Sequence, residues 1–147
     1  MIPLRFVGFG LAGLLVIGVA AGAVAGSVTR TQTCVSWVSY ADEAAMAKDS
    51  DVVVEGVVGA VTGKVDLLGG PGDGHVFEVS AVRQGVLDAT TITVVSPRDW
   101  CTANPPQPAD PLREGDRVVL YLRDLPTSDA WSTLTPFQGV IPLDSSG

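Results

Sequence analysis

The sequence is poor in the residues that most often carry catalysis or bind metals. Its 147 residues include one histidine, His75, and two cysteines, Cys34 and Cys101. Two cysteines and one histidine cannot complete a four-ligand zinc site without carboxylates. A serine–histidine–aspartate triad would need His75 as its base, and no serine lies in a G-x-S-x-G motif. We therefore predict no catalytic residue, no metal site and no cofactor, and a protein that is not an enzyme.

Around His75, two interpretations compete. A metal site can be imagined from Asp73, His75 and Glu78, but we favour a solvated histidine at the entrance of a strand. The neighbouring residues 69–74 have the sequence GGPGDG, which lacks the Lys-Ser/Thr pair of a phosphate loop and predicts a hairpin connection. Paired carboxylates among the 16 acidic residues could support a hydrolase, although the sequence does not tell which of them meet.

Basic residues are also scarce. Nine lysines and arginines against sixteen acidic residues give a formal net charge of −7. Because an acidic surface repels phosphate groups, nucleic acid is not expected as a partner. Anionic lipid surfaces would repel it too, so any membrane attachment should depend on the N-terminal segment.

Charge is absent altogether from residues 6–26, which follow Arg5. As a helix, this apolar stretch would span roughly 30 Å and match a bilayer core. Ala23-Val24-Ala25 fits the small-x-small pattern before a signal cleavage site. Residues 1–26 are thus expected to form an N-terminal hydrophobic helix, either a cleaved signal peptide or a transmembrane anchor. We expect the rest of the chain outside the cytoplasm, secreted or membrane-anchored.

The two cysteines of an exported chain are expected to form one disulfide, Cys34–Cys101. In the chain-entropy model, closing a loop of this length stabilises the fold by roughly 4 kcal/mol. Metal ligation or a reactive thiol is the less favoured interpretation.

After a polar spacer at residues 27–33, the remaining residues 34–147 are expected to form one domain. Ser39 is predicted to cap a short helix over residues 40–48, with Asp42 and Glu43 in its first turn. Apolar residues then recur with a period of two, and Gly56 and Gly59 indicate bulges or tight coiling. Strands are predicted at residues 51–61, 76–83, 90–96, 117–123, 131–134 and 140–143, with a long irregular loop at 97–112. Residues 63–68 either continue the first strand or form a hairpin arm. This pattern is typical of a small, mostly β barrel or sandwich.

Several segments follow one another in a characteristic order: Cys34-Val-Ser-Trp37, then SDVVVEG at residues 50–56, FEV and VRQG within residues 77–85, and GDRVVLYL at residues 115–122. Together they resemble the N-terminal OB-fold domain of the tissue inhibitors of metalloproteinases and the bacterial exported proteins that share this domain. The resemblance extends from Cys34 to about Asp144. It implies a five- to six-stranded OB-fold-like barrel with one short helix.

The family's inhibitory chemistry is not carried over by this resemblance. In those inhibitors the first cysteine is the mature N-terminus, and its free α-amine and carbonyl chelate the zinc of the protease. Cys34 instead follows the predicted cleavage point by about eight residues, and Ser36 stands where the family has its second cysteine. Processing between Thr33 and Cys34 would restore the free amine.

The resemblance implies a partner-binding edge, for which the candidates are Cys34, Val35, Ser36, Trp37 and Trp100. OB folds also bind ligands through aromatic residues on the barrel face, so Trp37, Trp100 or Trp131 could contact a sugar or a protein. We favour core packing for each tryptophan, and we expect Trp100 to be the most exposed because it lies in the long loop. We expect a non-enzymatic, exported binding module of the bacterial cell envelope whose partner is another envelope or secreted protein. The alternative is a metalloprotease inhibitor that acts through the Cys34 edge.

Overall fold

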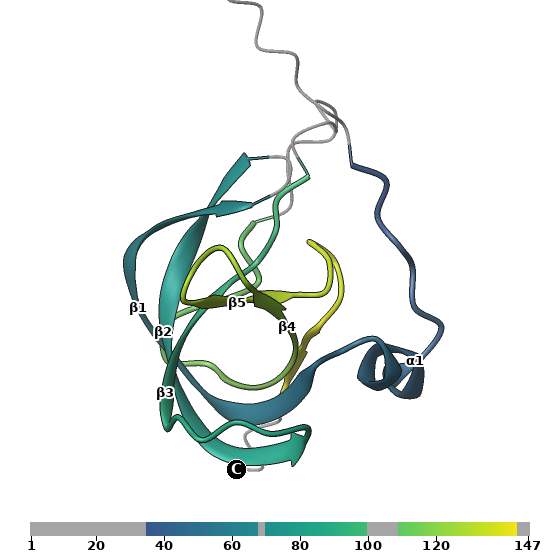
Figure 1. Cartoon of the computed structure of the whole chain (residues 1–147), viewed down its shortest axis with the longest axis horizontal. Helices are drawn as coiled ribbons and strands as arrows, with labels where there is room; N and C mark the ends of the chain where they lie inside the picture. Colours follow the sequence, from purple (N-terminus) through teal and green to yellow (C-terminus); the bar gives the residue numbers. More distant parts are fainter. Residues whose placement is uncertain (1–34, 68–69, 100–108, 144–147) are drawn as a thin grey trace, which may run out of the picture. The chain divides into compact units, whose positions relative to one another are not determined.

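The computed structural model describes residues 35–67, 70–99 and 109–143. These residues are mostly β with one small helix, as predicted. The elements, shown in Figure 1, are α1 (Glu43–Lys48), β1 (Val52–Leu67), β2 (Gly70–Gln84), β3 (Thr91–Val95), β4 (Arg117–Leu125), β5 (Ala130–Thr133) and β6 (Val140–Pro142). The predicted N-terminal helix, the spacer, both cysteines and Trp100 lie outside the described residues. Within the described ranges, no helix is long and apolar enough to cross a membrane.

Helix α1 is shorter than predicted and begins later. Its N-cap is Asp42, whose carboxylate accepts a hydrogen bond from the Ala45 N–H at 2.8 Å. The prediction that Ser39 caps this helix was therefore wrong. A carboxylate at the N-cap satisfies an N–H group of the first turn and also interacts favourably with the helix dipole.

The strands pair in a ring. Strand β1 pairs with β2, β2 with β3, β3 with β5, β5 with β4, and β4 pairs again with β1. Strand β6 adds to β4, and only the β3–β5 pairing is parallel. Figure 1 shows β1, β2 and β3 curving around an interior that β4 and β5 also face. Register shifts at Gly56 and around Gly59 interrupt the β1–β2 ladder, as the sequence predicted, and such bulges increase the local twist of the strands.

Residues 63–67 continue the first strand, which is one of the two predicted alternatives, and β2 begins earlier than predicted because the segment expected to be a hairpin connection belongs to it. Gly70 to Gly74 pair with β1 in the register Leu67↔Gly70 to Gly63↔Gly74. A Cβ atom on Gly72 would lie 2.5 Å from a methyl carbon of Val95. The glycines thus allow close packing against the neighbouring strand, and this tertiary contact overrides their turn propensity.

Two hydrophobic clusters stabilise this arrangement. Alternate residues of four strands meet in the interior cluster, which consists of Val52, Val54, Val58, Phe77, Ile92, Val94, Leu112, Val118, Leu120 and Leu122. The opposite faces of β1 and β4 pack with α1 in the outer cluster, which consists of Met46, Val53, Val119, Tyr121 and Leu134. The Tyr121 hydroxyl donates to Glu43 Oε2 at 3.0 Å, and burial, followed by this bond, raises the pKa of Tyr121. Both faces of the first half of β1 and of the middle of β4 are therefore covered.

Candidate functional site

A cleft opens where the pairing between β3 and β5 stops. Only two residue pairs join these strands, Val94↔Trp131 and Val95↔Ser132. The first half of β3, Thr91 to Thr93, pairs with β2 on one side and has no strand partner among the described residues on the other. The cleft beside it has a volume of about 430 Å³, which is within the range of small-ligand sites.

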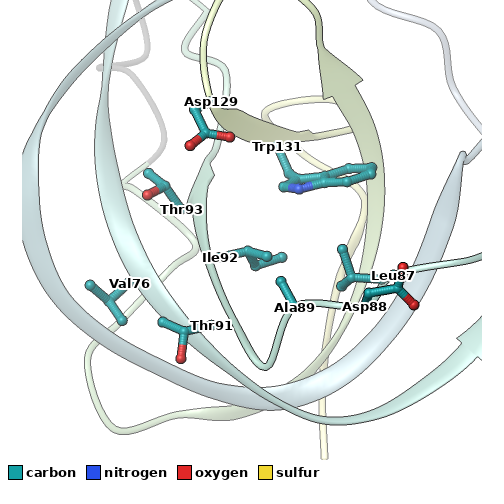
Figure 2. Close-up of a pocket in the computed structure, with 9 residues that line it drawn as sticks. All are labelled: Val76, Leu87, Asp88, Ala89, Thr91, Ile92, Thr93, Asp129 and Trp131. Carbon is teal, nitrogen blue, oxygen red and sulfur yellow. The ribbon is translucent and has the colours of Figure 1, made fainter.

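The walls of the cleft differ in character. Figure 2 shows Trp131 and Leu87 on one side, Thr91 and Thr93 on the other, and Ile92 between them. Trp131 and Leu87 pack partly buried against the interior cluster, which holds the indole in place from behind. The cleft therefore offers a supported aromatic surface opposite a polar strand.

The charge of the cleft is entirely negative. Asp129, from the β4–β5 connection, and Asp88, from the β2–β3 connection, both line it, and no lysine, arginine or histidine among the described residues does. Neither carboxylate forms an ion pair within the part of the chain that the structure describes. A cationic group that entered this cleft would meet two uncompensated carboxylates beside an aromatic ring.

The described residues of the partner-binding edge predicted from the sequence do not line this cleft. Val35 and Trp37 are partly buried and Ser36 is exposed, while Cys34 and Trp100 fall outside the described residues. Trp37 lines a separate cavity of about 210 Å³ with Pro97 and others, which shares no lining residue with the cleft beside Trp131. The Trp37 indole N–H is buried and has no hydrogen-bond partner among the described residues.

His75 is buried, so the prediction of a solvated histidine was wrong. Its Nδ1 lies 3.2 Å from the carbonyl oxygen of Gly59, and its Nε2 lies 3.2 Å from Oδ2 of Asp110. The ring is only 5% exposed because β2 begins at Gly70, which puts His75 well inside the strand.

The metal site imagined from Asp73, His75 and Glu78 is not formed. Glu78 is exposed, and Asp73 is engaged by Lys64 and Arg98. Across the described ranges, no group of three potential ligands is placed to hold a metal ion.

The Asp73 carboxylate should contribute to stability in a pH-dependent way. The hydrogen bond from Lys64, with the nearby charges of Lys64, Arg98 and His75, holds the pKa of Asp73 below its usual value against the opposing effect of burial. A depressed pKa stabilises the fold above the unfolded pKa of about 4, and this contribution is lost as the pH falls through the lower, folded-state pKa.

In urea unfolding at pH 6 and pH 2.5, we expect Asp73→Asn to lose less stability on acidification than wild type. Asp66→Asn, which removes an exposed carboxylate without a described ion pair, is the control and should behave as wild type. Equal acid sensitivity of the Asp73→Asn variant and wild type would contradict the prediction.

Sequence reasoning named Trp131 but missed the cleft around it. Asp129 precedes the predicted strand, so the period of two that orders side chains within a strand gave no signal that Asp129 lies beside Trp131. The sequence around Asp88 likewise gave no signal that this residue lines a cleft.

Comparison of the chain with protein-family models, curated proteins and solved structures found no match.

Proposed function

We propose that this chain is a non-enzymatic, exported binding module of the bacterial cell envelope, built as an OB-fold-like barrel, and that it binds its ligand in the cleft beside Trp131. The observation that carries the proposal is this cleft, with its supported indole and two carboxylates that form no ion pair among the described residues. The barrel assignment is supported by the ring of strand pairings with a parallel β3–β5 contact.

The position of the cleft supports a binding role. OB folds bind ligands over the second and third strands and through the loop between the fourth and fifth. The cleft uses β2 at Val76, β3 at Thr91 and Thr93, and the β4–β5 connection at Asp129. Its acidic lining and the net charge of −7 disfavour nucleic acid, which many other OB folds bind.

The apolar residues 6–26 support the location outside the cytoplasm. A module held at the membrane or released from it would meet other envelope or secreted proteins, and these are the partners we propose.

The test compares two tryptophans in separate cavities. The full chain, immobilised in a neutral detergent, is incubated with a cell-envelope extract, and the retained molecules are quantified by mass spectrometry. We expect Trp131→Ala to lose a specific partner by at least tenfold, because a buried aromatic anchor often carries 2 kcal/mol or more of binding energy. Trp37→Ala, which alters the other cavity, should retain that partner. Identical retained sets on wild type and Trp131→Ala would refute the proposal.

A further inference from the structure

We propose that the cleft binds an extended peptide segment carrying a basic side chain, which adds as a strand to the open edge of β3. The inference rests on the proposed function and specifies the ligand of the same site. Three independent observations support it: an unpaired strand edge, an aromatic wall and a carboxylate lining.

The first observation concerns the direction of the peptide groups of β3. The Val79 N–H donates to the Thr90 carbonyl at 2.9 Å, and this pair continues the β2–β3 register. Hydrogen-bonded and non-hydrogen-bonded pairs alternate along an antiparallel ladder, so every second residue from Thr90 directs its peptide groups to β2. The residues between them, Thr91 and Thr93, direct their peptide groups toward β5 and the cleft.

The β5 strand does not reach these groups. Its pairing with β3 begins at Val94↔Trp131. The hydrogen bonds of a parallel pair slant to the neighbours of the paired residue, so this pair engages the carbonyl of Thr93 and nothing earlier in β3. Both peptide groups of Thr91 and the N–H of Thr93 thus face the cleft without a partner among the described residues. Proteins usually cover or pair such an edge, whereas a peptide ligand can complete it.

The second and third observations concern the side chain that such a peptide would bring. Alternate residues of an added strand point to opposite faces, so one of them would extend toward Trp131. A guanidinium or ammonium group over an indole gains a cation–π interaction, and Asp129 and Asp88 line the same space. The net charge of −7 would also speed the encounter with a basic segment.

A neutral sugar is the main competing ligand. A pyranose ring could stack on Trp131, but it would leave unexplained the peptide groups of Thr91 and Thr93 that face the cleft. A peptide strand accounts for these groups, for the indole and for the carboxylates together.

The test starts from a displayed library of random linear heptapeptides, selected on the full wild-type chain in neutral detergent with counter-selection on Trp131→Ala. We expect the enriched peptides to share a lysine or arginine between β-branched or aromatic residues. The strongest peptide is then synthesised in two forms, one unmodified and one N-methylated at the residues on either side of the basic one. N-methylation removes backbone donors without changing charge, and it should weaken binding at least tenfold.

Asp129→Asn is the matched protein variant, because this exposed side chain forms no hydrogen bond among the described residues and its change should not affect folding. We expect it to bind the unmodified peptide at least tenfold more weakly. In amide NMR spectra, the unmodified peptide should shift the Thr91 and Thr93 signals of the wild-type chain.

Other outcomes separate the two proposals. Enriched peptides that lack a basic residue, bind Trp131→Ala equally or tolerate N-methylation would overturn the peptide inference. The peptide inference would also fail if the library showed no enrichment and an N-acetylglucosamine tetramer shifted the Thr91 and Thr93 signals. In that case the proposed binding function would still stand. If neither probe binds and the extract comparison shows no Trp131-dependent partner, both proposals fail.

Discussion

Replacing Gly56 with alanine is expected to lower the free energy of unfolding by about 3 kcal/mol, at the upper end of the usual cost of overpacking. A Cβ atom at this position would lie 2.0 Å from the carbonyl oxygen of Glu78 and 2.8 Å from the ring of Phe77. The oxygen belongs to the backbone of the paired strand β2, and the ring is fully buried. Because close-packed interiors have little room to relax, the strands must separate locally. Urea unfolding of the full chain measures the change.

Gly63→Ala is the matched control in the same strand. A Cβ atom on Gly63 would have no atom within 4 Å, so we expect a change of at most about 1 kcal/mol, in the stabilising direction. The double variant Gly56→Ala/Phe77→Leu should remain less stable than the single variant Phe77→Leu, because the smaller side chain at residue 77 leaves the Glu78 carbonyl in place. An unchanged unfolding midpoint for Gly56→Ala would show that β1 and β2 do not approach each other as closely as described.

The periodic part of the fold could be predicted from the sequence. Valine-rich segments with a period of two predicted a mostly β domain of five or six strands, and the described residues form six. Residues 118–122 predicted β4 because apolar side chains occupy both of its alternating faces. A strand that is covered on both faces needs such a pattern. The early start of β2 was missed, since GGPGDG has the local composition of a turn. Its place in β2 depends on close packing against Val95, which local composition does not encode.

The candidate site could be predicted only in part. Trp131 was noted as an aromatic residue that could contact a ligand, and Asp129 lies two residues before it. The cleft itself depends on where β3–β5 pairing stops, which is a relation between strands far apart in the sequence. The edge predicted from the family resemblance centres on Cys34 and Trp100, outside the described residues, so that prediction stays a prediction.

The burial of His75 is the clearest error of local reasoning, and its cause is also distant. The glycines and the aspartate that precede His75 suggested solvent, but the ring meets Gly59 of β1 and Asp110, which is 35 residues further along the chain. Asp110 in turn accepts a hydrogen bond from the N–H of Leu112 at 2.9 Å, and Leu112 belongs to the interior cluster. His75 and Asp110 therefore fasten the segment before β4 to the middle of the sheet.

Replacing either His75 or Asp110 with alanine is expected to lower the free energy of unfolding by about 3 kcal/mol, the upper end of the cost of leaving a buried polar group without its hydrogen-bond partner. The upper end applies because Asp110 contacts both His75 and the N–H of Leu112. Each substitution leaves a partner with an unsatisfied polar atom, and His75→Ala also opens a cavity. Urea unfolding of the full chain at neutral pH measures both effects.

Asp110→Asn tests whether hydrogen-bond geometry accounts for this cost. A carbonyl and a carboxylate only accept hydrogen bonds, so both contacts of His75 form only when both ring nitrogens carry hydrogen or Asp110 is protonated. With asparagine, Nδ1–H still donates to Gly59, Nε2 accepts from the new amide, and the amide oxygen still accepts from the Leu112 N–H. We therefore expect Asp110→Asn to cost less than about 1 kcal/mol, the net worth of an ordinary hydrogen bond. If it is as destabilising as Asp110→Ala, charge rather than hydrogen bonding links the two segments, because the carboxylate charge is what both substitutions remove.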